Sequence, residues 1–228
     1  MSHAFPPRPQ PAIAVAGGGP AYPVARIFCV GRNYAAHARE MGGAIDPEAP
    51  FFFTKSPAHL APSGATIPYP PGTADFQHEV ELVVALGAPL FRATPAAAAA
   101  AVWACAAGLD MTRRDLQAAA RERRLPWDTG KDVEGSAVVG ALGRGFVPEG
   151  QAITLTVNGA RRQEGRLSDM ARGVAELLAH LSGLYHLGPG DIVFTGTPAG
   201  VGPVLPGDVL EGRIDGLAPV RLTIGPPD

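Results

Sequence analysis

Residues 76–87, FQHEVELVVALG, constrain the fold more than any other stretch, because they place two carboxylates inside an apolar strand pattern. Side chains alternate between the faces of a β-strand, so Glu79 and Glu81 point to one face while Val80 and Leu82 point to the other. Two carboxylates this close repel each other. They are tolerated if a cation lies between them, if one is protonated, or if both face solvent.

A third carboxylate, Asp110, follows an apolar segment and precedes a helix N-terminus signature. Three carboxylates from two strand ends suit a hard divalent cation such as Mg²⁺ or Mn²⁺, which keeps open positions for water and substrate. Zinc is disfavoured, because Cys29 and Cys105 have no partner at CxxC spacing and the sequence contains no HExxH. The pattern therefore makes Glu79, Glu81 and Asp110 candidate metal ligands.

The rest of the chain predicts short strands. We expect them at residues 24–30, 51–55, 153–157, 191–194, 208–214 and 218–224. The pair Asn158-Gly159 predicts a β-hairpin turn, and three consecutive aromatic residues at 51–53 predict a strand that is buried on both faces.

Three segments predict helices. Thr94 and Pro95 are typical of the cap and first turn of a helix, which we expect to end at Gly108. Residues 112–115 resemble a capping box that opens a second helix. Ser168 is expected to cap a third helix that ends near Leu181 and carries an apolar stripe on its core face.

Three motifs together resemble the fumarylacetoacetate hydrolase family, and most closely its bacterial fumarylpyruvate hydrolases and acylpyruvases. These motifs are HEVEL at 78–82, GLDMTRRD at 108–115 and TGTPAGVG at 195–202. The resemblance runs from about residue 23 to the C-terminus, and it implies a mixed, mainly β (α+β) fold of rolled and sandwiched sheets with few helices. We therefore expect an irregular N-terminal arm over 1–22 and one catalytic domain over 23–228.

The resemblance also gives a role to His37 and Glu40. They are three residues apart, so a helix places them on one face within hydrogen-bonding reach. Such a pair in isolation is more often exposed on a polar helix face. In the family the pair in this motif is the general base, and it belongs to a lid, here residues 30–45, that orders over bound substrate.

Further site residues follow from the same resemblance. Lys131 is expected to stabilise a developing enolate, and Arg114 and Gln117 to contact substrate. Thr197 lies in the loop that binds the substrate's carboxylate end in the family. Arg32 or Arg114 would neutralise the far carboxylate of the substrate, and the role of a second lysine at position 55 stays open.

The implied reaction is metal-dependent hydrolysis of the carbon–carbon bond of a 2,4-dioxo acid, with Mg²⁺ as the expected cofactor and Mn²⁺ or Ca²⁺ as other possibilities. Fumarylpyruvate, an intermediate of aromatic (gentisate) catabolism, would yield fumarate and pyruvate. The second reading is decarboxylation of oxaloacetate, or decarboxylation with isomerisation of a longer oxo acid, at the same metal. A third, of another class, is a ligand-binding paralogue without turnover.

Composition limits the partners. A net charge of −2 provides no basic surface for nucleic acid. The longest apolar run is too short for a membrane span. The two cysteines and an N-terminus without a signal peptide's apolar core predict a cytoplasmic protein. The family resemblance implies a homodimer with a small oxo acid as ligand.

Overall fold

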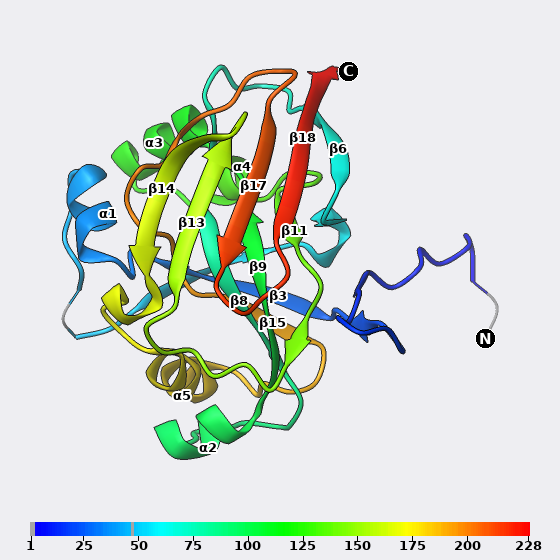
Figure 1. The fold of residues 1–228 in the computed structure, drawn as a ribbon, viewed down its shortest axis with the longest axis vertical. Helices are drawn as coiled ribbons and strands as arrows, with labels where there is room; N and C mark the ends of the chain where they lie inside the picture. Colours follow the sequence, from blue (N-terminus) through cyan, green and yellow to red (C-terminus); the bar gives the residue numbers. More distant parts are fainter. Residues whose placement is uncertain (1–2, 47) are drawn as a thin grey trace.

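The described part of the chain is built mainly from β-strands, as Figure 1 shows. The structure is a computed structural model that describes residues 3–46 and 48–228. The predicted mixed, mainly β fold is confirmed. Among the described helices, none combines the length and apolar character needed to cross a membrane.

The larger sheet carries the strands that hold the candidate site. Its order is β4 (Phe51–Lys55), β3 (Arg26–Gly31), β15 (Asp191–Phe194), β8 (Val80–Leu86), β9 (Val102–Asp110), β11 (Ala137–Val139) and β5 (Leu60–Pro62), with β12 (Gly143–Arg144) paired to β9. Strand β8 runs antiparallel to both β15 and β9. All seven residues of β8 are buried, as expected of a central strand covered on both faces.

A five-stranded sheet covers one face of the larger sheet and lies in front of it in Figure 1. Its order is β14 (Ala160–Arg166), β13 (Ala152–Val157), β17 (Val209–Ile214), β18 (Val220–Pro227) and β6 (Ala65–Tyr69). The two sheets come very close at Gly212 of β17, where a Cβ would lie 2.9 Å from Val80 Cγ2. A side chain at this position would therefore force the sheets apart.

The remaining strands form two small sheets. One contains β10 (Thr112–Arg113), β7 (Phe76–His78) and β16 (Gly202–Pro203), and the other pairs β1 (Ala12–Ile13) with β2 (Tyr22–Pro23). The predicted carboxylate strand thus has two parts, β7 and β8, and Glu79 lies at their junction. In the N-terminal arm Ile13 is buried, and Ala16 N donates to Leu142 O at 2.9 Å, so this part of the arm packs against the larger sheet.

The helices are short, and the longest described one has eleven residues. They are α1 (Ala35–Glu40), α2 (Pro95–Ala100), α3 (Arg114–Glu122), α4 (Asp128–Lys131), α5 (Val174–Leu184) and the 3₁₀ helices η1 (Pro57–His59) and η2 (Leu167–Asp169). Helices α1 and α3 lie on the same side of the molecule in Figure 1, and Arg121 Nη1 of α3 donates to Met41 O, just after α1, at 2.9 Å.

The prediction of a helix from Pro95 to Gly108 is wrong beyond Ala100. Thr94 does cap α2, but residues from Val102 to Asp110 form β9, which pairs with both β8 and β11. Pairing on two sides and the burial of residues 104–110 outweigh the helix propensity of the alanines. The small residues here serve close packing instead, since a Cβ on Gly108 would lie 2.5 Å from Val83 Cγ2.

The predicted burial of residues 51–53 on both faces is also wrong. Strand β4 is the edge of the larger sheet, so Phe52 and Phe53 are only partly buried and Phe51 is 37% exposed. The rings of Phe51 and Phe53 pack on Trp127 instead, with centroids 5.1 and 6.1 Å from it.

Two helix starts also differ from prediction. Thr112 belongs to β10 and does not cap α3, which begins at Arg114 without a side-chain cap. Helix α5 begins at Val174, after η2 and Gly173, rather than at Ser168. Its predicted apolar stripe is confirmed, because the helical members are buried: Val174, Leu177, Leu178 and Leu181.

Candidate metal centre and catalytic cavity

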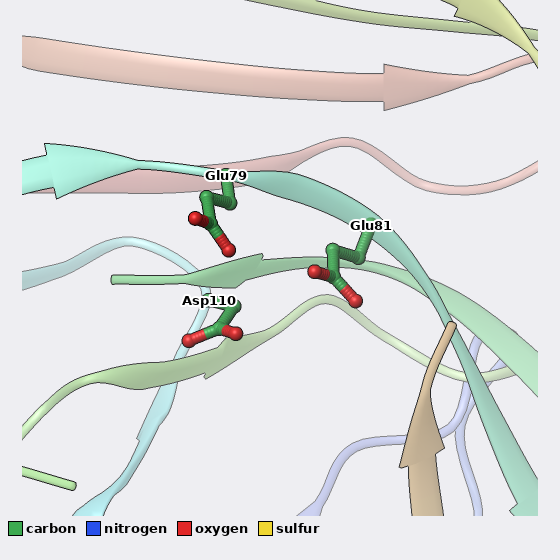
Figure 2. Close-up of side chains that lie close together, drawn as sticks. All are labelled: Glu79, Glu81 and Asp110. Atoms are coloured by element: carbon green, nitrogen blue, oxygen red, sulfur yellow. The ribbon is translucent and has the colours of Figure 1, made fainter. Parts of the chain in front are cut away.

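The fold brings Glu79, Glu81 and Asp110 together. Strand register places Val80 opposite Leu109, and Asp110 N donates to Glu79 O at 2.9 Å, so Asp110 ends β9 directly beside Glu79. One carboxylate oxygen from each residue lies within 4.8 Å of the others, and all three side chains are buried. Figure 2 shows their carboxylates turned toward a shared space.

Lys131 lies against this cluster. Its Nζ donates to Glu79 Oε2 at 2.7 Å, to Asp110 Oδ2 at 2.8 Å and to Thr112 Oγ1 at 2.8 Å. Burial lowers the pKa of Lys131, but Asp110 and Glu79 outweigh it and the net shift is upward. The ammonium is therefore charged and already bound to two carboxylates.

Lys55 is a site residue whose role the sequence left open. Its Nζ lies 2.9 Å from Asp110 Oδ1, and it donates to Met111 O at 3.1 Å and to Lys131 O. A lysine at the end of a strand is usually solvated, and nothing local distinguishes this one. The pairing of β4 with β3 and the position of β9 bring it here, so local sequence gave no indication of its contact with Asp110, and the family resemblance left its role open.

The three carboxyl groups differ in their electrostatic surroundings. Burial raises the pKa of Glu79, but Lys131 and Arg114 together hold it below its ordinary value. Burial, Asp110 and Glu79 all raise the pKa of Glu81 well above its ordinary value. Gly196 N donates to Glu81 Oε2 at 2.6 Å, but Glu81 has no ion pair with a cationic side chain within the described residues.

These residues fit a hard divalent cation. Asp110 Oδ1 is buried and accepts no hydrogen bond, despite its ion pair with Lys55, so it retains a lone pair for a metal. When Glu81 is ionised, no cationic side chain of the described residues pairs with it, so a bound metal ion would be its cationic partner. An all-oxygen set of this kind matches Mg²⁺ or Mn²⁺ rather than zinc.

His37 and Glu40 lie on α1, where His37 Nδ1 is 3.1 Å from Glu40 Oε2. The imidazole is buried, whereas a third of the Glu40 side chain is exposed. Gly200 N also donates to Glu40, at 3.0 Å from Oε1 and 3.2 Å from Oε2. The carboxylate is thus held from two sides, by the helix and by the loop after β15.

A cavity of about 650 Å³, counted with its opening to solvent, joins the dyad to the carboxylate cluster. Its lining includes eight of the ten residues predicted from the sequence: Arg32, His37, Glu79, Glu81, Arg114, Gln117, Lys131 and Thr197. The other two, Glu40 and Asp110, contact lining residues. Their roles stay predictions, but the positions are compatible with one site.

The guanidinium of Arg114 is already engaged on three sides. It donates to Gln77 Oε1 at 2.8 Å, to Gln117 Oε1 at 2.5 Å and to Glu79 Oε1. Arg32 is held differently, with its guanidinium 6.0 Å from the centroid of the Phe51 ring. Of the two arginines considered for the far carboxylate, the geometry favours Arg32.

Comparisons with known proteins identify the family of this chain. Residues 26–225 match the fumarylacetoacetate (FAA) hydrolase C-terminal family. The chain is 48% identical over 190 residues to the fumarylpyruvate hydrolase of Ralstonia sp, covering 82% of this chain and 99% of that protein. It is 37% identical over 203 residues to the oxaloacetate tautomerase YcgM of Escherichia coli (strain K12), covering 86% and 90%.

Solved structures give the same answer. The crystal structure of fumarylpyruvate hydrolase from Pseudomonas aeruginosa in complex with Mn²⁺ and pyruvate superposes with a TM-score of 0.95 at 41% identity, covering 99% of this chain and 100% of that one. The family match covers most of the chain, the alignments cover nearly the whole length of the relatives, and the solved structure has the same fold. This chain belongs to the fumarylacetoacetate hydrolase family.

Proposed function

We propose that this chain is a metal-dependent hydrolase of a 2,4-dioxo acid, with fumarylpyruvate as substrate and fumarate and pyruvate as products. The observation that carries the proposal is the arrangement of the cavity: His37, Glu79 and Glu81 line it, and Glu40 and Asp110 contact residues of its lining. The similarity to a fumarylpyruvate hydrolase over nearly its whole length supports the choice of substrate.

Glu79, Glu81 and Asp110 would hold the metal. A divalent cation held by these residues would supply Lewis-acid chemistry at the ketone of the 2-oxo acid. The expected ion is Mg²⁺, and the Mn²⁺ in the similar P. aeruginosa structure supports a divalent cation.

The dyad would activate the attacking water. Glu40, oriented by His37 and by Gly200 N, accepts a proton as the water oxygen bonds to C4 of the substrate. The bond between C3 and C4 then breaks, and its electron pair stays on C3 as the enolate of pyruvate. Return of the proton to C3 completes pyruvate, and the acyl fragment leaves as fumarate.

Two cationic groups would assist this step. Lys131 Nζ, buried beside Glu79 and Asp110, is placed to stabilise negative charge on the enolate oxygen. Arg32 would pair with the far carboxylate of the fumaryl group, with Gln117 and Thr197 as further substrate contacts. The catalytic domain over 23–228, the homodimer, the cytoplasmic location and the place in gentisate catabolism stay predictions.

The second candidate function is decarboxylation of oxaloacetate, or decarboxylation with isomerisation of a longer oxo acid, on the same metal ligands. The oxaloacetate tautomerases among the relatives support oxaloacetate as a ligand of such a site. Chemistry at oxaloacetate needs no attacking water, so it would depend less on Glu40. A non-catalytic paralogue is disfavoured, because the candidate ligands, the dyad and Lys131 all line one cavity or contact its lining.

A measurement of pyruvate release distinguishes these candidate functions. The purified protein, loaded with Mg²⁺ or Mn²⁺, is given fumarylpyruvate, acetylpyruvate and oxaloacetate in parallel. We expect rapid cleavage of fumarylpyruvate that Glu40→Ala abolishes, whereas Glu122→Ala, which removes an exposed glutamate on α3, has no effect. Turnover of oxaloacetate only would favour the second function, and no turnover of any substrate would refute both.

A further inference from the structure

Gln163 is a completely buried polar side chain on a strand that is otherwise largely exposed. Strand β14 has the burial of a surface strand, and Arg162 and Glu164 on either side of Gln163 are exposed. Gln163 faces the sheet interior beside Leu155, its cross-strand partner on β13. Burying an amide is costly unless its hydrogen bonds are made, so its partners explain its presence.

All four hydrogen-bonding positions of the Gln163 amide are used. Oε1 accepts from Val80 N at 3.0 Å and from His78 Nδ1 at 3.0 Å. Nε2 donates to Thr197 Oγ1 at 2.8 Å and to Pro198 O at 2.9 Å. A backbone N–H only donates and a carbonyl only accepts, so Val80 and Pro198 determine which end of the amide faces which partner.

One end of this amide holds the strand of the candidate metal ligands. Val80 lies between Glu79 and Glu81, so its backbone N–H anchors the chain at the point from which both carboxylates extend. His78 contacts the same end of the amide, and because Gln163 Oε1 only accepts hydrogen bonds, His78 Nδ1 must carry the proton that it donates.

The other end holds residues 195–200, here called the substrate loop. Gly196 N of this loop donates to Glu81 Oε2, and Gly200 N donates to Glu40. The loop therefore supplies one amide to the candidate metal ligand and one to the candidate base. Gln163 binds it between these two points, through Thr197 and Pro198.

The backbone of β14 packs against the same loop. A Cβ on Gly200 would lie 2.1 Å from Arg162 O. Only glycine at this position therefore lets the loop lie so close to the backbone of β14. The β13–β14 register shifts between Leu155 and Thr156, next to the pair formed by Leu155 and Gln163. Arg162 therefore has no partner on β13, while the alternation of the strand turns Gln163 inward between its exposed neighbours.

We propose that Gln163 is a positioning residue for the hydrolysis proposed above, on which this inference rests. It couples the strand of the metal ligands to the substrate loop, so that Glu81 and Glu40 receive their amide hydrogen bonds in one fixed geometry. Gln163 is not among the residues that line the cavity, so it acts through Val80, Thr197 and Pro198.

Two variants separate its contacts. Gln163→Glu keeps an acceptor for Val80 N but turns an oxygen toward Pro198 O, whereas Gln163→Met is of similar length and makes none of the four hydrogen bonds. We expect Gln163→Glu to lower kcat for fumarylpyruvate by about 10- to 100-fold with little change in Mn²⁺ affinity. For Gln163→Met we expect both a lower kcat and a lower affinity for Mn²⁺. This variant serves as the test if the glutamate variant does not fold.

A second readout does not depend on activity. Hydrogen exchange at the amides of the substrate loop is expected to accelerate in Gln163→Glu, because Thr197 and Pro198 lose the two hydrogen bonds that Gln163 Nε2 donates to them. The control is Leu155→Ala, which leaves a cavity at a fully buried position of β13 and lowers stability while all four hydrogen bonds of the Gln163 amide keep their donors and acceptors. At temperatures well below the Tm of this control, we expect kcat and the hydrogen exchange of the substrate loop to have wild-type values.

The outcomes distinguish the two proposals. If the wild type does not turn over fumarylpyruvate, the proposed function fails, and loop exchange still decides whether Gln163 positions the loop. The inference is overturned if Gln163→Glu leaves kcat and loop exchange unchanged, with Gln163→Met doing the same where the glutamate variant is unfolded. It is also overturned if Leu155→Ala reproduces both losses.

Discussion

Lys131→Met tests the electrostatic account of the site, because it removes a charge without removing bulk. In the wild type the Lys131 ammonium donates to Glu79 and Asp110, and both carboxylates are buried. Without it, two buried carboxylates lose a cationic partner. We therefore expect the metal-free variant to be destabilised and to bind a divalent cation more tightly.

The magnitude follows from the partners that remain. Removing one member of a buried ion pair costs about 3–5 kcal/mol of unfolding free energy. Glu79 retains Arg114 and Asp110 retains Lys55, so we expect the lower end, ~3 kcal/mol, for the metal-free protein. A bound cation replaces the lost charge, and we expect Mn²⁺ affinity to rise at least about tenfold, which recovers ~1.4 kcal/mol.

Urea denaturation of the metal-free and Mn²⁺-saturated proteins measures this directly. The cost of Lys131→Met should be smaller with Mn²⁺ than without it, while kcat falls because the enolate loses its cation. Leu155→Ala is the control, since a cavity in β13 should cost the same in both forms. An equal or larger cost of Lys131→Met in the Mn²⁺ form would refute the reasoning.

Three further predictions follow from the site. The raised pKa of Glu81 means that metal binding displaces a proton, so Mn²⁺ affinity should increase with pH; calorimetry in buffers of different ionisation enthalpy should detect the released proton, and its absence would contradict the account. Gly200→Ala places a Cβ 2.1 Å from Arg162 O at a φ of +95°, so stability and kcat should both fall, and wild-type values of Tm and kcat would show that the loop adapts. Lys55 and Lys131 are the only lysines in the sequence and both are buried, so an amine-acylating reagent should modify them only after unfolding, as peptide mass spectrometry would show; rapid labelling of the native protein would mean that the site is open.

Local sequence patterns predicted the parts of the fold that depend on local chemistry. Alternation placed Glu79 and Glu81 on one face, and the Asn158-Gly159 pair marked the turn between β13 and β14. The family resemblance supplied the dyad and the other cavity residues. These predictions needed only spacing, turn chemistry or a motif of consecutive residues.

Other features depend on contacts between distant residues, and the sequence could not predict them. The alanine-rich stretch favours a helix locally, but β9 follows Ala101 because β8 and β11 pair with it on both sides. Lys55 is 55 positions from Asp110 in sequence and meets it only through sheet order. Gln163 lies on a polar strand, and only the packing of β14 over the substrate loop makes it a buried connection.

The most direct test of the central claim is turnover in H₂¹⁸O. If a water molecule activated by His37 and Glu40 attacks C4, mass spectrometry should find one ¹⁸O in the fumarate formed from fumarylpyruvate by the Mn²⁺-loaded wild type. Glu40→Gln should form no fumarate. Unlabelled fumarate, or consumption of fumarylpyruvate with release of carbon dioxide and no fumarate, would contradict hydrolysis by this dyad.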